Sequence, residues 1–550
     1  MKQGVGFYLK FFSLCLVVFL VCSDAAAEQK LLTVAESSDF KATSTYSQVM
    51  DFIRDLQAET AMMKVETLCV SPEGRKVPLL IIGNPLPSSP MDLRRDHRAV
   101  VYIQANIHAG EVEGKEASLM LVRDILMQVN PPYLDDLVIL ICPIFNADGN
   151  EKIDPQNRRN QVGPELGVGI RYNGQNLDLN RDGLKMESPE VSGLAANVLN
   201  RWDPLLLVDC HTTNGSYHIE PVTYVWSLDP NGDHTLINYM AEKMMPEVDK
   251  VLEEKYGTLG IPYGNWMDFS DPGKGWRPAG PEPRYLTNYI GLRNRLSILL
   301  ENYAYADYKT RVMGNYHFLK SVLDYSTAHR EEIKDLIRKA DLGAIKKGQN
   351  PAGHTFGLAF EGKALKHTVT IQSYEMKVIP REGGGRPRVQ RSDIRKDYTV
   401  PYFADYVPTR SVPFPYGYLI TVPDKDVANK LIQHGIVVEQ LVKPTIIEAE
   451  SFKIKSLKGA ERIYQGHRQN SIEGEYSTVS REFPASTYYV GTAQILGNLA
   501  AALLEPESGD GLLAWNYFDK YIAAQWGRST QDCPVYRILK PVKMVTHIVR

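Results

Sequence analysis

The chain has 550 residues, 43% hydrophobic and 23% charged, a balance that is typical of folded proteins and excludes wholesale disorder. Its 33 prolines and 41 glycines follow no period, which argues against collagen-like and repeat architectures. The formal net charge of −3 provides no general attraction to nucleic acid, so we expect no nucleic-acid partner and a ligand that is recognised at a local site.

The first residues have the pattern of a secretory signal peptide. Lys2 and Lys10 accompany a short apolar run over residues 11–21, and small residues follow at positions 25–27. The apolar run is shorter than the roughly 20 residues that span a bilayer. We therefore predict a signal peptide over residues 1–27, a secreted or periplasmic protein, and no stable membrane anchor after cleavage.

Residues 43–345 alternate between helical and strand-like patterns. Helices are predicted over 43–60, 113–129 and 307–345, a β-hairpin over 65–70 and 77–82, and buried strands over 100–103, 137–142, 205–208 and 296–300. Strands that alternate with helices indicate an α/β fold. We predict a mixed, mostly parallel sheet flanked by helices, and assign this catalytic domain to residues 28–349.

The composition changes near residues 346–353. A glycine run at 383–385, a basic stretch and a proline-rich segment follow, then one predicted helix within 422–435 and a strand over 436–442. Most of the remainder consists of short strand-like runs rich in tyrosine and valine. We predict that residues 350–550 form a smaller β-rich accessory region of one or two small domains.

Reactive side chains follow three of the predicted buried strands. His108 and Glu111 come after the strand over 100–103, His211 after 205–208, and Glu301 after 296–300. Ligands of open α/β sheets bind beyond the carboxyl ends of the strands, and histidine and carboxylate side chains are good zinc ligands. Each signal alone is weak, since a histidine at a strand end is more often a structural residue. A carboxylate after an apolar run is desolvated, which raises its pKa and suits it to proton transfer.

Asn180 and Arg181 lie at the end of another segment with an alternating pattern. The alternating residues 176–180 predict a strand that ends at Asn180 and Arg181. Arg181 has two interpretations, because it can also form a simple ion pair with Asp178 or Asp182.

The order of the motifs carries more information than any one of them. The chain reads HAGE at 108–111, NADG at 146–149, NRRN at 157–160, NLDLNRD at 176–182, DCHTT at 209–213 and LLEN at 299–302. This order resembles the zinc metallocarboxypeptidase family, which includes carboxypeptidases A and B, over about residues 45–330. The sequence departs from the family pattern at Ala147, where the family usually has proline.

The resemblance implies a role for each matched residue. His108, Glu111 and His211 would bind one zinc ion per chain, and Glu301 would be the catalytic glutamate. Asn180 and Arg181 would hold the terminal carboxylate of the substrate, a task that suits guanidinium geometry. Arg159 best matches the arginine that steadies the developing oxyanion, although Arg158 is adjacent. The family's mobile tyrosine is not identified; Tyr285 and Tyr289 are the candidates.

The sequence therefore predicts an exported zinc-dependent carboxypeptidase that hydrolyses the C-terminal peptide bond of peptides or proteins. An alternative is an amidohydrolase of the same fold that acts on cell-wall muropeptides or N-acyl amino acids. A remote alternative is a catalytically inactive peptide-binding protein, which would require the loss of a ligand or of Glu301; all four residues are present.

Overall fold

A computed structural model describes residues 31–380, 388–522 and 532–549 of the chain. The predicted signal peptide over residues 1–27 lies outside these ranges. Across the described ranges, none of the helices combines the length and the apolar character needed to cross a bilayer.

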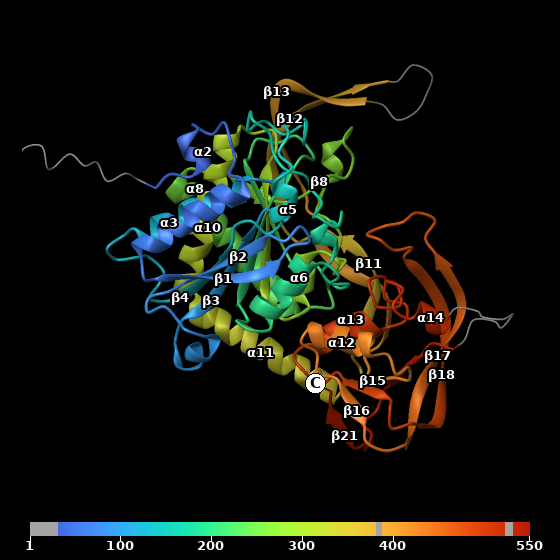
Figure 1. The fold of residues 1–550 in the computed structure, drawn as a ribbon. Helices are drawn as coiled ribbons and strands as arrows, with labels where there is room; N and C mark the ends of the chain where they lie inside the picture. The colour runs from blue at the N-terminus through green and yellow to red at the C-terminus, as the bar shows by residue number, and fades with distance from the viewer. Residues whose placement is uncertain (1–30, 381–387, 523–531, 550) are drawn as a thin grey trace, which may run out of the picture.

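The described part of the chain contains an eight-stranded mixed sheet at the centre of the α/β region (Figure 1). Its strands, in spatial order, are β1 (Met63–Val70), β2 (Lys76–Ile82), β4 (Leu137–Cys142), β3 (Ala99–Ala105), β5 (Leu206–Thr213), β10 (Leu296–Tyr303), β6 (Val222–Trp226) and β7 (Gly260–Pro262). The four central strands β4, β3, β5 and β10 run parallel. Every residue of β3 and β4 is buried, which explains why both read as continuous apolar runs. The predicted mixed, mostly parallel sheet is confirmed.

Helices pack around this sheet. The main ones are α3 (Tyr46–Glu59), α4 (Glu113–Leu126), α7 (His234–Tyr239), α8 (Met245–Tyr256), α9 (Leu286–Gly291), α10 (Tyr308–Ala328) and α11 (Arg330–Gln349); shorter ones are α2 (Val34–Ser37), α5 (Ala147–Asn150) and α6 (Pro189–Leu194). The helical stretch predicted over 307–345 is two helices, α10 and α11, because the chain leaves helical geometry at His329. The sequence reading did not identify β6, α7, α8 or α9.

The strand predicted over residues 176–180 is wrong. This segment is a turn followed by a 3-10 helix over Leu179–Arg181. The side chain of Asn173 accepts a hydrogen bond from the Leu177 amide, and that of Asp178 accepts one from the Asn180 amide. Such local side-chain bonds offer the backbone an alternative to a ladder, and here they outweigh the alternating hydrophobic pattern.

The residues after 350 are rich in strands, as predicted. Two hairpin-like ladders pair β11 (Thr355–Lys363) with β14 (Asp405–Pro413) and β12 (Thr368–Ile379) with β13 (Arg388–Pro401). A seven-stranded antiparallel sheet contains, in spatial order, β18 (Asn470–Phe483), β17 (Thr445–Gly459), β20 (Val535–Ile538), β15 (Gly417–Ile420), β19 (Tyr488–Gly491), β16 (Glu439–Leu441) and β21 (Thr546–Ile548). The same region of the chain has three helices among its described residues, α12 (Lys425–Gln433), α13 (Gly497–Leu504) and α14 (Asp519–Ile522). The β12–β13 ladder projects from the body of the molecule, at the top of Figure 1.

The β-rich region packs against the α/β region through buried contacts. His434, at the end of α12, is completely buried. Its Nε2 lies 2.9 Å from the carbonyl oxygen of Leu184 and therefore carries the proton, so its Nδ1 accepts from the Tyr289 hydroxyl at 3.0 Å. Burial lowers the pKa of His434 to about 3, and the positive charges of Lys430 and Arg293 add to this. The histidine is thus held neutral at the contact between the two regions.

Candidate metal centre and active site

Three parallel strands bring the predicted reactive residues to one edge of the sheet. His108 and Glu111 lie in the turn after β3, His211 lies on β5, and Glu301 lies on β10. β5 is the central strand of the three, and Glu301 is directly opposite His211 in the β5–β10 register. Because the carboxyl ends of parallel strands share an edge, residues nearly 200 positions apart become neighbours.

The turn after β3 is shaped by its own residues. Asn106 has a φ of 65°, a conformation that asparagine tolerates better than most residues. Its amide donates hydrogen bonds to the carbonyl oxygens of Ala109 and Glu111, both at 3.2 Å. A Cβ atom at Gly110 would lie 2.5 Å from Cδ of Arg158. The glycine of the HAGE motif therefore leaves the space that the Arg158 side chain occupies.

The three predicted ligands form a compact donor triangle. Nδ1 of His108 lies 3.1 Å from Oε2 of Glu111, Nδ1 of His211 lies 3.0 Å from the same oxygen, and the two Nδ1 atoms are 3.2 Å apart. All three side chains are buried. Zinc binds histidine nitrogen and carboxylate oxygen at about 2.0–2.2 Å, and a triangle of this size accommodates those distances. The donor set fits zinc and leaves an open position for a fourth ligand.

A carboxylate lies behind each of the two histidine rings. Nε2 of His108 lies 3.0 Å from Oδ1 of Asp178, and Nε2 of His211 lies 2.9 Å from Oδ2 of Asp209. The second contact is an ion-pair distance without good hydrogen-bond alignment. Asp209 also accepts a hydrogen bond from Nε2 of Gln104 at 3.2 Å. A carboxylate at Nε2 keeps the proton there and directs the Nδ1 lone pair towards a metal. The sequence alone suggests Asp178 only as an ion-pair partner of Arg181 and assigns no role to Asp209.

The surrounding charges favour the anionic, ligating form of Glu111. Burial opposes ionisation of Glu111, but His108 and Arg158 outweigh it and hold the pKa of Glu111 well below its usual range. The carboxylate of Glu111 is therefore available as an anionic ligand at neutral pH. Burial also opposes the charged form of His211, but the adjacent Asp209 outweighs it and raises the pKa of His211 well above its usual value. Because a ligating imidazole is neutral, zinc binding at His211 would release a proton.

Glu301 is a partly buried acid beside the triangle. Its Oε2 is buried and has no hydrogen-bond partner within the described ranges. Burial raises the pKa of Glu301 to about 8; Glu111 also raises it, whereas His211, Arg158 and Arg171 lower it. A carboxyl group with a pKa shifted towards neutrality and an uncommitted oxygen can both accept and return a proton.

The structure separates the two candidate arginines. Arg159 is exposed, and among the described residues its side chain forms no hydrogen bond or ion pair with the triangle. Arg158 points into the site: its Nη1 donates to Oε1 of Glu111 at 2.9 Å and its Nη2 donates to the carbonyl oxygen of Thr212 at 2.9 Å. Arg171, which the sequence reading did not identify, donates from Nε to Oδ2 of Asp178 at 2.7 Å.

Asn180 and Arg181 lie in the 3-10 helix after Asp178. Oδ1 of Asn180 accepts a hydrogen bond from the Leu286 amide at 2.9 Å, which attaches this helix to the start of α9. The guanidinium of Arg181 lies over the ring of Tyr285, 4.6 Å from its centroid, and its Nη1 is 3.9 Å from Oδ2 of Asp178. Asp178 therefore links the His108 side of the site to the Arg181 side.

The tyrosine candidates differ in their surroundings. Tyr289 is completely buried and bonded to His434, whereas Tyr285 is half-buried and faces Arg181. A third tyrosine, Tyr263, lies close enough to Glu301 for that acid to add to the effect of burial, and both raise the pKa of Tyr263. No sequence pattern distinguishes Tyr263 from the other 29 tyrosines.

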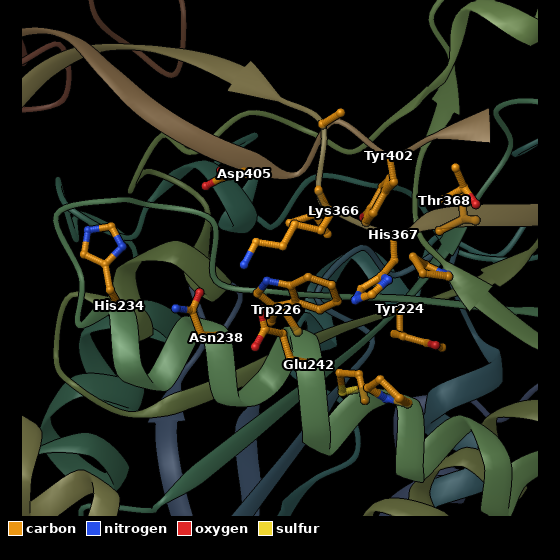
Figure 2. A pocket seen from close by; sticks show the side chains of 17 residues that line it. Tyr224, Trp226, His234, Asn238, Glu242, Lys366, His367, Thr368, Tyr402 and Asp405 are labelled. Carbon is orange, nitrogen blue, oxygen red and sulfur yellow. The ribbon is translucent and has the colours of Figure 1, made fainter.

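A cavity of about 840 Å³ lies apart from these residues (Figure 2). His234, Asn238 and Glu242 line it from one side, and Lys366 and His367 face them from the segment before β12. None of the predicted site residues lines this cavity.

Comparison with known proteins agrees with the motif order. The family model described as zinc carboxypeptidase matches residues 49–185, a range that includes His108, Glu111, Asn180 and Arg181. Carboxypeptidase 2 of Trichophyton rubrum is 23% identical over 508 residues, which cover 88% of this chain and 87% of that protein. Carboxypeptidase 2 of Trichophyton equinum is 22% identical over 81% of this chain and 78% of that protein. The first of these matches must extend into the β-rich region, because the residues before 350 are less than two-thirds of the chain.

Two solved structures with some similarity are metallo-carboxypeptidases. That from Burkholderia cenocepacia is 17% identical, with a TM-score of 0.38, and the match covers 52% of this chain and 70% of that chain. That from Pseudomonas aeruginosa is 15% identical, with a TM-score of 0.39, and the match covers 53% of this chain and 70% of that chain. The family model and the curated relatives confirm what the order of the motifs predicts. The chain carries a zinc carboxypeptidase domain and is related to the metallocarboxypeptidases.

Proposed function

We propose that this protein is an exported zinc-dependent carboxypeptidase that removes the C-terminal residue of peptides or proteins. His108, Glu111 and His211 would hold one zinc ion per chain through the two Nδ1 atoms and the Glu111 carboxylate. When bound at such a site, zinc lowers the pKa of a coordinated water and polarises the carbonyl group of a substrate. Asp178 and Asp209 would keep the two imidazoles in the tautomer that binds a metal.

Glu301 is the proposed general base and acid. Its raised pKa and its Oε2 without a partner support this role. The carboxylate would take a proton from the attacking water and then deliver it to the nitrogen of the leaving amino acid. The reaction consumes one water, breaks the C–N bond and forms a carboxyl group and a free amine.

Arg158, rather than Arg159, is the arginine that we propose to steady the carbonyl oxygen during attack. Its guanidinium is already in hydrogen-bond contact with the proposed ligand Glu111 and with the carbonyl oxygen of Thr212. Preorganised donors of this kind stabilise the charge that develops on the oxygen.

Asn180 and Arg181 would bind the free carboxylate of the substrate. The contacts of Arg181 with protein acceptors use Nη1 alone, which leaves Nε and Nη2 available for a bidentate pair. The observation that best supports the proposed function is the combination of the donor triangle with an uncommitted Glu301 oxygen on the adjacent strand.

Peptide pairs that differ only in a free or amidated C-terminus test this proposal. We expect the purified, zinc-loaded protein to release the last residue of the free acids at least about 100-fold faster, because an amide leaves the buried side of Arg181 without its charged partner. Arg181→Ala should lower the rate on free acids by about 100-fold and hardly change any residual cleavage of amides. Equal rates on both peptides in the unmutated enzyme would exclude a carboxypeptidase and favour an endopeptidase or a deacylase, for which muropeptides and N-acyl amino acids are the next substrates to assay by mass spectrometry.

A further inference from the structure

The segment that faces Arg181 is held by the α/β region on one side. Arg284, Tyr285 and Leu286 connect the preceding loop to α9. The Leu286 amide donates to Oδ1 of Asn180 at 2.9 Å, and the Arg284 carbonyl oxygen accepts from the Gly183 amide at 3.1 Å. Tyr285, between these two bonds, places its ring 4.6 Å from the Arg181 guanidinium.

The β-rich region holds the same segment from the other side. Asp510 accepts hydrogen bonds from both the backbone amide and Nε of Arg284, at 3.2 and 3.1 Å, and its second oxygen lies 2.8 Å from Nη2. The guanidinium of Arg284 also lies 5.7 Å from the ring of Tyr464 and 5.6 Å from that of Trp515. The Asp510 side chain is only 2% exposed, so this charge has been removed from water and interacts strongly with its partner.

A loop of the β-rich region reaches the other end of the carboxylate site. Between β17 and β18, Gln465 has a φ of 52° and its Oε1 accepts a hydrogen bond from the Asp178 amide at 2.9 Å. His467, two residues later, lies 2.9 Å from both carboxylate oxygens of Glu187. The residues that flank Asn180 and Arg181 in sequence are therefore attached to the loop that carries Tyr464.

We propose that Asp510 is a positioning residue for recognition of the substrate carboxylate. It holds Arg284, which fixes the backbone of Tyr285 and so keeps the Tyr285 ring against the guanidinium of Arg181. The rings of Tyr464 and Trp515 lie against the Arg284 guanidinium and limit its movement. This inference rests on the proposed carboxypeptidase function, and it makes the β-rich region a part of the substrate site.

Asp510→Asn in the full-length, zinc-loaded protein tests the inference. The asparagine keeps the shape and one acceptor but removes the charge. For free-acid peptides we expect KM to rise between about 10-fold and 100-fold, the range for a binding group misplaced by up to about 1 Å. The zinc content and kcat should stay close to those of the unmutated enzyme, because a change confined to binding appears in KM.

Glu450→Gln is the matched control. Glu450 pairs with Arg537 at 2.6 Å within the β-rich region; the Arg537 side chain is 3% exposed and that of Glu450 is 21% exposed. Arg537 keeps Glu505 as a second acidic partner, so this variant weakens a partly buried ion pair of the same region that is separate from the Arg284–Leu286 segment. We expect its KM to be unchanged. An equal rise in KM for Glu450→Gln would overturn the inference, because it would show a general effect of weakening the region.

Tyr464→Leu provides a milder variant in case Asp510→Asn does not fold, as judged by circular dichroism. It removes one ring beside Arg284 from a half-buried loop position and should raise KM in the same direction by a smaller factor. An unchanged KM in a folded Asp510→Asn, or in Tyr464→Leu where Asp510→Asn is unfolded, would overturn the inference while leaving the proposed function intact. Absence of any cleavage of free acids by the unmutated enzyme would instead refute the proposed function, on which the inference depends.

Discussion

Replacement of Asp178 by asparagine is expected to weaken zinc binding without removing a ligand. Oδ1 of Asp178 lies 3.0 Å from Nε2 of His108 and accepts from the Asn180 amide at 3.0 Å, while Oδ2 accepts from Nε of Arg171 at 2.7 Å. An asparagine can accept through one oxygen only, so at least one of these donors loses its acceptor. It also carries no charge to hold the proton on Nε2 of His108.

The structure sets the size of the effect. Asp178 is 5% exposed, so water cannot readily replace the lost acceptor. Loss of a carboxylate behind a ligating histidine typically costs 10- to 100-fold in metal affinity. Because two further donors also depend on Asp178, we expect the upper part of that range, which corresponds to about 2–3 kcal/mol of zinc binding free energy.

Competition with a fluorescent zinc chelator at pH 7.5 measures this affinity directly. Asp182→Asn is the matched control: Asp182 is completely buried, pairs with Lys185 and accepts hydrogen bonds from Ser188. Within the described residues it forms no hydrogen bond or ion pair with the three proposed ligands. The zinc affinity of this control should remain within about threefold of the unmutated protein, a change of less than about 1 kcal/mol.

An unchanged zinc affinity in folded Asp178→Asn would refute the idea that this carboxylate orients His108. Equal losses in both aspartate variants would show that the region responds to the removal of any buried charge. In either case the role of Asp178 would be structural rather than specific to the metal centre.

Three further predictions concern the site and its support. Glu301→Gln should lower kcat by about 10²–10⁴-fold, the usual contribution of a general base, with one zinc per chain still present by elemental analysis; loss of the metal together with activity would contradict the assignment. Arg158→Ala should lower kcat/KM by about 10²–10³-fold, as the loss of an oxyanion donor does, whereas Arg159→Ala, an exposed position, should hardly change steady-state kinetics; the reverse order would restore the alternative assignment. His434 has a pKa of about 3 in the folded protein and of about 6.5 when unfolded, so the unfolded state binds the additional proton and stability falls as the pH falls below 6.5. Between pH 7.5 and 4.5 the free energy of unfolding should fall by about 2–3 kcal/mol because of His434. In denaturant unfolding, the decrease over this interval should be smaller by that amount in His434→Gln than in the unmutated protein. An equal decrease in both proteins would argue against a neutral buried imidazole.

The central sheet was predictable because burial on both faces leaves a clear trace in sequence. The residues of β3 and β4 are all buried, and a strand without a solvent-facing side is a continuous apolar run. β6, by contrast, has only five residues, Val222–Trp226, too short a run to establish a strand pattern. α9 has only six, Leu286–Gly291, too few to establish a helical period.

The clustering of His108, Glu111, His211 and Glu301 was predictable, because each follows a predicted buried strand and the carboxyl ends of parallel strands share an edge; their roles stay predictions. The choice between Arg158 and Arg159 could not be made in the same way, because a loop has no period that says which of two neighbours points inwards. Arg158 has a φ of 50°, a backbone state with no sequence signal for arginine. The hydrogen-bond partners of the histidines depend on packing between distant segments, and a single sequence does not contain that information.

The contacts of the β-rich region with the Arg181 side of the site join very distant parts of the chain. The Asp178 amide and Gln465 are 287 residues apart, and Arg284 and Asp510 are 226 apart. During synthesis, all three proposed ligands and Glu301 leave the ribosome long before Asp510 does. At about 5–20 residues per second, the interval between Glu301 and Asp510 is about 10–40 s. A nascent chain can therefore assemble the proposed zinc site well before Asp510 can position the proposed carboxylate-binding residues. If both proposals hold, efficient peptide cleavage would begin only after Asp510 has been made.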